Sequence, residues 1–317
     1  MSLRRQRWTA ADIPDQSGRV AVVTGANTGL GFETTRELAQ RGATVVLACR
    51  DLAKAQAATE RIRDEIGSAK LQTVRLDLAS LASVREASDQ LRADHPAIDL
   101  LINNAGVMAL QTFQRSEDGH ELTFATNHLG PFAFTGRLLD RVLAAPDSRI
   151  VTVSSIGHRD GSMHFDDLDL ERDYHPWQAY WQSKLANLLF TYELHARLQT
   201  ASAETAAVAA HPGNARTELW RWTPKLTRTL YRPRLRSLTF WFAQSAPMGA
   251  LATLRAATDP NARSGDYYGP PGRLQYTGYP TRVDSSADSH DVEAQRRLWT
   301  ISEQLTGVSY PIATPTA

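Results

Sequence analysis

Short apolar runs alternate along this chain with longer stretches in which apolar residues recur at helical spacing. Six runs are rich in β-branched and other apolar residues and predict buried strands at 19–24, 44–49, 72–77, 98–104, 149–154 and 206–211. A seventh, shorter strand is expected near Tyr267 and Tyr268. Helical periodicity fills the intervals, most clearly over 29–41, 121–143 and 178–197.

Strand, helix and strand in series predict an α/β fold. Parallel strands joined by right-handed crossovers give a doubly wound (Rossmann) sheet, here of about seven strands with helices on both faces. With 317 residues the chain is long for one domain, so we expect a single domain with appendages. We assign residues 1–16 to an N-terminal extension, 17–275 to the sheet domain and 276–317 to a C-terminal tail with an amphipathic helix over 289–306.

Composition and charge narrow the class of protein. Hydrophobic residues make up 42% and charged residues 22% of the chain, and no apolar run is long enough to span a membrane. A net charge of +1 gives no reason to expect nucleic acid as a partner. The single cysteine, Cys49, excludes an internal disulfide, and no apolar stretch follows the arginines near the N-terminus as a secretory signal requires. We therefore expect a cytoplasmic location.

A glycine-rich turn stands where the first strand ends and the first helix begins. Residues 24–31 read TGANTGLG, with the glycine spacing G-x-x-x-G-x-G. Glycines let the backbone turn tightly there and approach a pyrophosphate, whose charge the helix N-terminus can meet. An ordinary turn would also explain the glycines, so the motif alone predicts dinucleotide binding only weakly.

Two charged residues after later strands bear on the cofactor. Arg50 follows the second strand, where NAD-binding sheets carry an acidic residue for the ribose 2′-hydroxyl. A guanidinium would instead hold a 2′-phosphate, which favours NADP(H) over NAD(H), although Arg50 could also be a solvated residue beside Asp51. Asp77 closes the third strand and could accept a hydrogen bond from adenine or cap the helix that begins near Ser80.

Polar residues recur at the carboxyl ends of the later strands, the edge where ligands of such sheets bind. The fourth strand runs into NNAG at 103–106, and Ser155 follows the fifth. Asn127 falls inside a helical pattern, which is unfavourable unless its side chain or a displaced backbone is used. Tyr180 and Lys184 lie four residues apart and so share one face of a helix.

Taken in this order, the motifs resemble the short-chain dehydrogenase/reductase family over residues 17–270. Within that family the chain is most similar to the group with retinol dehydrogenases, the WW-domain oxidoreductase and protochlorophyllide reductase. This narrower resemblance rests on TGANTGLG at 24–31, ACRD at 48–51, NHLGPF at 127–132 and YWQSKLANLLF at 180–190.

The resemblance implies hydride exchange between a nicotinamide and a carbonyl or alcohol carbon. Tyr180 would be the general acid or base, and the positive charge on Lys184 would lower the pKa of the Tyr180 phenol. Lys184 would also hold the nicotinamide ribose, Ser155 would bind the substrate oxygen, and Asn127 would hold a water that links Lys184 to solvent. Apart from Arg50 and Asp77, the cofactor contacts that we predict are Gly25, Asn27, Thr28, Gly29, Leu30, Gly31, Leu78, Asn104, Ala105, Gly106, Tyr180, Lys184, Pro212, Gly213, Asn214 and Thr217.

Two segments depart from the common pattern. The resemblance makes 218–246 a substrate lid, and from Leu219 to Thr258 basic and aromatic residues interleave without one acidic residue. This composition favours a bulky apolar substrate, but it also suits contact with an anionic membrane surface, or a lid that packs its own aromatic side chains. The acidic insert 157–177 either borders the substrate mouth or is a solvated excursion.

We expect an NADP(H)-dependent oxidoreductase acting on a lipophilic ketone, aldehyde or alcohol. Reduction of a carbon–carbon double bond is one alternative, and a cofactor-binding regulator without turnover is another. His128 and His211 have no second ligand at metal-binding spacing, so no metal site is predicted. Dimers and tetramers are common in the family, and either state is compatible with this sequence.

Overall fold

One eight-stranded sheet organises the structure, a computed structural model in which residues 7–215 and 243–312 are described. The strand order is β3-β2-β1-β4-β5-β6-β7-β8. The strands are β1 (Val20–Thr24), β2 (Thr44–Cys49), β3 (Lys70–Arg75), β4 (Leu100–Asn103), β5 (Arg149–Val153), β6 (Ala206–Ala210), β7 (Tyr267–Gly269) and β8 (Thr281–Arg282). The first seven are parallel and confirm the predicted sheet. The two-residue β8 adds an antiparallel edge that no sequence pattern indicated.

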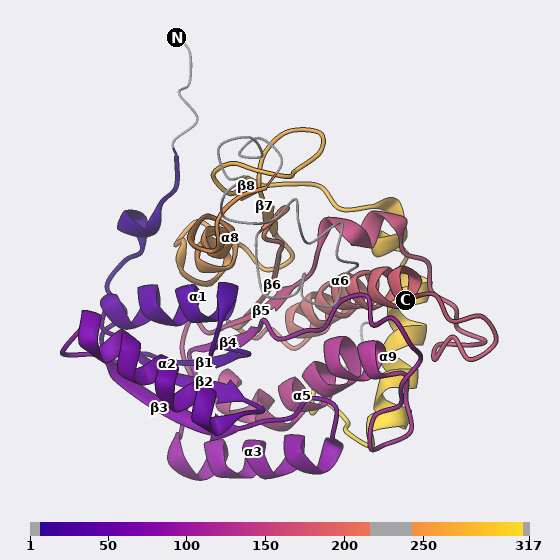
Figure 1. Cartoon of the computed structure of the whole chain (residues 1–317), viewed down its shortest axis with the longest axis horizontal. Helices are drawn as coiled ribbons and strands as arrows, with labels where there is room; N and C mark the ends of the chain where they lie inside the picture. Colours follow the sequence, from indigo (N-terminus) through magenta and orange to yellow (C-terminus); the bar gives the residue numbers. More distant parts are fainter. Residues whose placement is uncertain (1–6, 216–242, 313–317) are drawn as a thin grey trace.

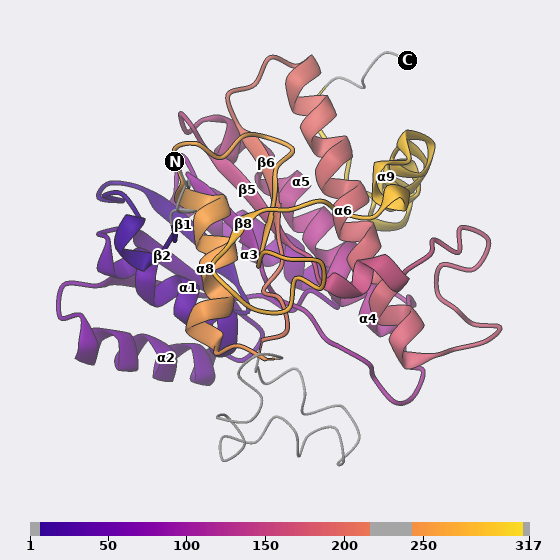
Figure 2. The same ribbon diagram turned by 90° about the horizontal axis from the view of Figure 1, so that it is seen from above.

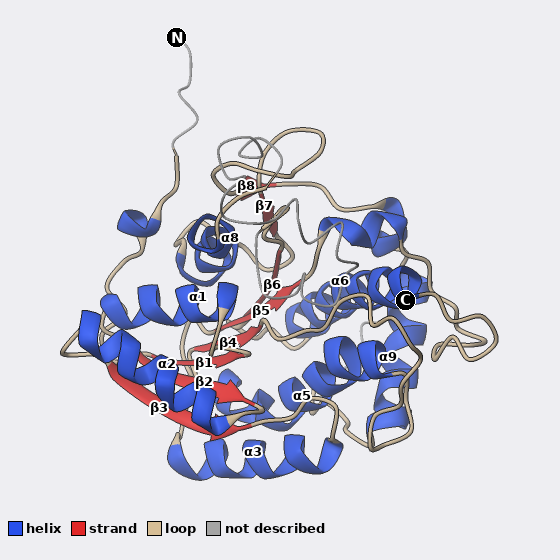
Figure 3. Cartoon of the chain, viewed as in Figure 1, coloured by secondary structure: helices blue, strands red, loops and turns tan. Residues whose placement is uncertain are grey.

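Helices cover both faces of the sheet (Figure 1, Figure 3). One face packs against α1 (Gly29–Gln40), α2 (Leu52–Glu65) and α8 (Ala246–Thr258). The other face packs against α3 (Leu81–Asp94), α5 (Gly130–Leu143) and α6 (Pro176–Thr200). The inner strands read as continuous apolar runs because both of their faces are buried, and every residue of β4 is buried.

The strand order reverses between β1 and β4, so the chain leaves these neighbouring strands in opposite directions along the sheet. Crossovers to β2 and β3 lie to one side and those to β5 and β6 to the other. A crevice therefore opens beyond the carboxyl ends of β1 and β4, which is where ligands of doubly wound sheets bind.

The tail helix α9 (Val292–Thr306) lies along the outer side of α6 (Figure 2). Trp299 stacks on Phe190 of α6 with ring centroids 5.8 Å apart, and Leu298 packs beside it into the same region. Because the sheet covers one side of α6 and α9 the other, most residues of α6 are buried. The predicted amphipathic helix is thus confirmed, although it begins three residues later than 289. No helix within 7–215 or 243–312 is long and apolar enough to cross a membrane.

The helix predicted over 121–143 is interrupted. It consists of a short α4 (Leu122–Phe124), a π-helical turn η2 (Ala125–Leu129) and α5. Pro131 has no N–H and cannot make the bond that an α-helix would require to the carbonyl oxygen of Asn127. The wider turn therefore falls on Asn127, the residue whose position in a helix was unfavourable.

Candidate active site

The glycine-rich turn between β1 and α1 has the backbone that its sequence predicts. Gly25 and Gly29 have φ of +65° and +57°, in the left-handed region that favours glycine. Gly31 is needed for a different reason, since a Cβ there would lie 2.4 Å from the carbonyl oxygen of Gly25 and 2.6 Å from Nδ2 of Asn104. The turn is therefore packed directly against the end of β4.

Thr24 and Asn104 join the ends of β1 and β4. Oγ1 of Thr24 accepts hydrogen bonds from the backbone N–H groups of Asn104 and Ala105, each at 3.0 Å. Nδ2 of Asn104 donates in return to the carbonyl oxygen of Thr24 at 2.8 Å. These bonds fix the two loops that form the floor of the crevice.

A cleft of about 490 Å³ follows this floor from the glycine-rich turn towards α2. The residues predicted to contact a cofactor that line it are Gly25, Asn27, Thr28, Gly29, Leu30, Gly31, Arg50, Asp77, Leu78, Asn104, Ala105 and Gly106. Two further cations on α2, Lys54 and Arg61, also line it. They were missed because basic residues on the outer face of a helix look like ordinary solvated positions.

The charged residues of this cleft differ in their partners. Lys54 pairs with Asp51 at 3.0 Å, and the guanidinium of Arg61 lies 4.3 Å from the ring centroid of Phe32. Arg50 is exposed and, within the described part of the chain, has no ion-pair partner. Its charge faces the cleft unneutralised.

Asp77 was considered either as an adenine contact or as the cap of the next helix, and it is not the cap. Ser80 caps α3 through its hydroxyl, which accepts from the backbone of Ser83. The carboxylate of Asp77 accepts from the N–H of Ala79 at 3.0 Å and lines the cleft. The adenine contact stays a prediction.

A second cleft, of about 340 Å³, opens beyond the carboxyl ends of β5 and β6. Tyr180 and Ser155 both line it, and Leu30 lines this cleft and the first one. Burial raises the pKa of the Tyr180 phenol above its ordinary value, and a hydrogen bond with the Ser155 side chain partly opposes this rise. The structure thus brings the predicted acid and its predicted partner together.

Lys184 lies behind Tyr180, one turn further along α6. Its Nζ donates to the carbonyl oxygen of Val153 at 3.1 Å and lies 5.8 Å from the centroid of the Tyr180 ring. Burial lowers the pKa of Lys184 to about 8. The expected lowering of the Tyr180 pKa by Lys184 is wrong for this structure, because desolvation of the phenol outweighs any attraction between them.

Ser154, the residue before Ser155, has a structural role. Its hydroxyl donates to the carbonyl oxygen of Lys184 at 2.7 Å. The bond joins the end of β5 to α6 and so sets the distance between the Ser155 loop and the helix that carries Tyr180.

Asn127 connects the β4 loop to α6 through its side chain. Oδ1 accepts from the N–H of Val107 at 2.8 Å, while Nδ2 donates to the carbonyl oxygen of Val107 and to Oγ of Ser183, both at 2.9 Å. A Cβ on Gly106 would lie 3.0 Å from Oδ1 of Asn127 and 3.5 Å from Nζ of Lys184. The side chain therefore joins the β4 loop to α6, and the water that Asn127 was expected to hold stays a prediction.

Aromatic and apolar side chains form much of the second cleft. Trp177 and Trp181 stack with ring centroids 6.2 Å apart, and Met108 and Leu274 line the same space. Leu274 is 60% exposed, so it leaves an apolar surface at the mouth. These walls suit a bulky apolar molecule.

The β6 loop completes this cleft with Pro212, Gly213 and Asn214. Gly213 has a φ of +62°, and a Cβ there would lie 2.4 Å from the carbonyl oxygen of Tyr276. Thr217 and nearly all of the predicted lid at 218–246 lie outside the described residues.

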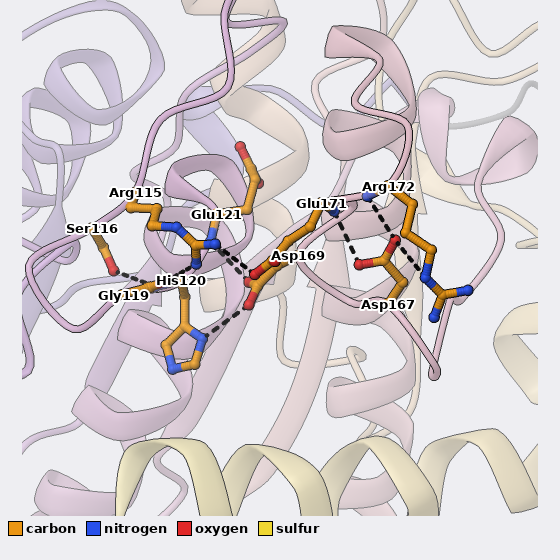
Figure 4. Close-up of polar contacts among 9 residues, drawn as sticks. All are labelled: Arg115, Ser116, Gly119, His120, Glu121, Asp167, Asp169, Glu171 and Arg172. Carbon is orange, nitrogen blue, oxygen red and sulfur yellow. Dashed lines mark hydrogen bonds and ion pairs between the residues drawn. The ribbon is translucent and has the colours of Figure 1, made fainter.

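Of the two roles considered for the acidic insert 157–177, its two ends take the first and border the second cleft. Gly157, Arg159 and Asp160 line the second cleft at its start, as Trp177 does at its end. Its middle is instead bound to the loop before α4 (Figure 4).

Two carboxylates make that attachment. Asp169 accepts from the backbone N–H of Glu121 at 2.8 Å and lies 3.4 Å from Nδ1 of His120, and Glu171 pairs with Arg115 at 2.6 Å. Asp169 raises the pKa of His120, and burial raises that of Glu121. These contacts hold the start of the helix that contains Asn127.

His128 and His211 are buried packing residues. Burial lowers the pKa of each to about 3, so both rings are neutral. Nε2 of His128 bonds to Oγ of Ser302 on α9 at 2.8 Å, and Nδ1 of His211 accepts from the N–H of Gly213 at 3.2 Å. Among the described residues no group of three or more His, Cys, Asp or Glu side chains could hold a metal ion.

The close packing at Gly31 gives a testable prediction. Gly31→Ala should lower the free energy of unfolding by about 1–3 kcal/mol, because the added methyl group overpacks the carbonyl of Gly25 and the amide of Asn104. Helix propensity alone would make the alanine variant more stable, so a lower free energy of unfolding could only come from the close packing. Chemical denaturation measures the change.

Gly67→Ala is the matched control, because its Cβ would meet nothing within 4 Å. It should leave stability unchanged or slightly increased. Equal stability of the two variants would contradict the packing seen at Gly31.

Comparisons with known proteins identify the family to which this chain is similar. The model of the short chain dehydrogenase family matches residues 19–225. Retinol dehydrogenase 13 of Homo sapiens is 41% identical over 305 residues, which cover 95% of this chain and 87% of that protein. Retinol dehydrogenase 11 of Mus musculus is 39% identical over 92% of this chain and 87% of its own length.

A solved structure agrees with these relatives. The crystal structure of an uncharacterised protein from Mycobacterium paratuberculosis shares 40% identity with a TM-score of 0.79, over 96% of this chain and 99% of that one. The chain therefore belongs to the short-chain dehydrogenase family, a family of oxidoreductases. Its similarity to retinol dehydrogenases confirms the group indicated by its motifs.

Proposed function

We propose that this protein is an NADP(H)-dependent oxidoreductase that interconverts a lipophilic ketone or aldehyde and the corresponding alcohol. One observation carries the proposal: the Tyr180 and Ser155 side chains lie together on the wall of an apolar cleft that meets the dinucleotide crevice at Leu30. A carbonyl oxygen bound between these two hydroxyls would lie where a proton can be delivered to it.

The residues divide the proton chemistry between them. A nicotinamide, when bound, supplies or accepts the hydride. Tyr180 gives its phenolic proton to the developing alkoxide, and the raised pKa of the phenol keeps that proton in place until the alkoxide forms. Ser155 orients the substrate oxygen. Lys184 is buried next to the phenol and can hold the ribose hydroxyls of the cofactor while it stabilises the phenolate after transfer.

The preference for NADP(H) rests on Arg50. Its exposed guanidinium lines the cleft at the end of β2, where a ribose 2′-substituent would lie, and Lys54 and Arg61 add positive charge nearby. Asp51 is the acidic residue closest to Arg50 in the chain, and it is paired with Lys54. A 2′-phosphate would therefore find a free cation there.

The substrate class follows from the walls and from the relatives. Trp177, Trp181, Met108 and Leu274 present apolar surface to a bound molecule. The curated relatives reported above are retinol dehydrogenases, which act on a bulky apolar alcohol by name. We propose that the substrate is a lipophilic alcohol or the matching carbonyl compound. We also propose that the protein is located in the cytoplasm.

The decisive experiment follows NADPH absorbance with a panel of lipophilic aldehydes, ketones and enones, together with NADP⁺ and the matching alcohols. Oxidation of NADPH by the aldehydes or ketones, with the alcohol as product, supports the proposal. A saturated carbonyl product from the enones alone would identify reduction of the double bond. Cofactor binding without turnover on any member would favour a regulator.

Arg50→Ala should remove the preference for the phosphorylated cofactor. We expect the affinity for NADPH to fall about 10- to 100-fold, as for the loss of a charge-assisted hydrogen bond, while the affinity for NADH changes little. Titration calorimetry with both cofactors measures this. Arg85→Ala removes the same charge from an exposed position of α3 outside the cleft and should leave both affinities unchanged. Equal affinities of the wild type for NADPH and NADH would refute the role of Arg50.

A further inference from the structure

His158 lies directly beneath the Ser155 loop and bonds through both of its ring nitrogens. The side chain is completely buried, in the short 3₁₀ turn η3 (Ile156–Asp160) that follows Ser155. Nδ1 lies 2.6 Å from the carbonyl oxygen of Ser155, and Nε2 accepts from the backbone N–H of Ser286 at 3.0 Å. These partners require one tautomer, with the proton on Nδ1 and a lone pair on Nε2.

The segment that holds Ser286 is itself anchored to α6. Oγ of Ser285 bonds to the phenol of Tyr192 at 2.8 Å and to Nε2 of His290 at 2.9 Å. Oγ of Ser289 donates to the carbonyl oxygen of Ser286 at 2.6 Å and lies 2.7 Å from Oγ of Ser285. The backbone N–H that donates to His158 is therefore held in place through Tyr192, which lies about three turns beyond Tyr180 on α6.

We infer that His158 is a positioning residue that ties the backbone of Ser155 to the 285–289 segment, so that the Ser155 hydroxyl is held against Tyr180. This inference rests on the proposed function, in which Ser155 binds the substrate oxygen. His158 does not line the cleft and so would not touch the substrate. It acts only through its bond to the backbone carbonyl of Ser155.

The surroundings of the ring maintain its neutral form. Burial is the main cause that lowers the pKa of His158, to about 4. The hydrogen bond to the carbonyl oxygen of Ser155 opposes this fall most strongly, and the charge of Arg159 assists it. The rings of Tyr267 and His211 complete the environment, and Tyr267 packs edge-on at 5.7 Å. An imidazolium would also point an N–H at the N–H of Ser286, so the donor from Ser286 specifies the neutral ring.

One substitution tests the bond from Ser286 selectively. Ser286 has a φ of −66°, which proline adopts, so Ser286→Pro removes the N–H with the φ angle unchanged. Ser286→Ala is the matched control, since it keeps the N–H and removes only a hydroxyl that has no partner among the described residues. With NADPH and decanal, we expect Ser286→Pro to lower kcat about 10- to 100-fold with little change in the KM for NADPH, and Ser286→Ala to match the wild type.

His158→Asn provides a second variant in case proline disturbs the turn. Asparagine can place an amide N–H near the position of Nδ1 and keep the bond to Ser155, but it cannot reach Ser286. We expect kcat to fall as in Ser286→Pro. His195→Asn is the control, because it makes the same change at a histidine of α6 whose Nδ1 bonds to the hydroxyl of Ser264 and which does not line the cleft.

Ring nitrogen chemical shifts of histidine in the protein without cofactor give a readout independent of turnover. The wild type should keep the His158 ring neutral with Nδ1 protonated down to pH 5, and Ser286→Pro should let the ring titrate nearer its ordinary pKa. A His158 ring that titrates near 6.5 in the wild type, or unchanged kcat in both Ser286→Pro and His158→Asn, would overturn the inference. Wild-type protein without carbonyl turnover would refute the proposed function instead, and the nitrogen shifts would still decide the arrangement of His158.

Discussion

Tyr180→Phe is expected to lower kcat for carbonyl reduction by about 10²–10⁴-fold, the loss that follows removal of a general acid. The change removes one oxygen atom. It leaves the ring packed against Trp177, whose centroid lies 6.3 Å away, and leaves Lys184 and its bond to Val153 in place. Affinity for NADPH should therefore change little, and the free energy of unfolding should stay within about 1 kcal/mol of the wild type because only one buried hydroxyl bond is lost.

Single-turnover kinetics with pre-bound NADPH separate this loss in the chemical step from slow product release. Tyr174→Phe is the control, because it removes a phenol that bonds the carbonyl oxygen of Leu110 and does not line the cleft. It should retain wild-type kcat. Activity of Tyr180→Phe within threefold of the wild type would exclude Tyr180 as the proton donor.

Acid should unfold this protein steeply, because three of its histidines are buried in the neutral form. Burial lowers the pKa of His128 and His211 to about 3 and that of His158 to about 4, whereas the unfolded chain titrates near 6.5. The unfolded state thus binds more protons as pH falls below 6.5. The stability that these groups contribute is fully present above that pH and is lost as pH falls towards 4.

The expected slope is about 1.4 kcal/mol per pH unit for each histidine, or about 4 kcal/mol per unit for three. Two units of this slope amount to about 8 kcal/mol, which is comparable to the whole stability of about 5–15 kcal/mol that is typical of a domain. Denaturant titrations at pH 7, 6 and 5 should give a loss that becomes steeper as pH falls and that approaches an uptake of three protons near pH 5. His128→Gln should reduce the number of protons taken up on unfolding by one. An uptake of less than one proton in the wild type would show that these rings are not neutral.

The sheet could be predicted from the sequence because its strands are buried on both faces and so carry continuous apolar runs. The meeting of Ser155, Tyr180 and Lys184 could be predicted because these residues occupy fixed places on those elements, and the structure brings them together. The π-helical turn at Asn127 was only partly foreseen, since the asparagine was conspicuous but the effect of Pro131 on its carbonyl depends on helix geometry. Strand β8 has two residues, too few to produce a pattern.

Other features depend on tertiary contacts that leave no local signal. The fall of the Lys184 pKa and the rise of the Tyr180 pKa come from burial, and a spacing of four residues says only that the two side chains are neighbours. His158 could not be singled out, because its partner Ser286 is 128 residues away. Lys54 and Arg61 became visible only when the cleft beside α2 was defined.

The position of α9 also has a consequence for synthesis of the chain. Phe190 and Leu189 lie on the side of α6 that Leu298 and Trp299 cover, so this surface stays open until more than a hundred further residues have left the ribosome. At typical elongation rates of about 5–20 residues per second, the nascent domain would expose it for several seconds. A chaperone that binds apolar helix surfaces would find its site here during translation and lose it when the tail folds back.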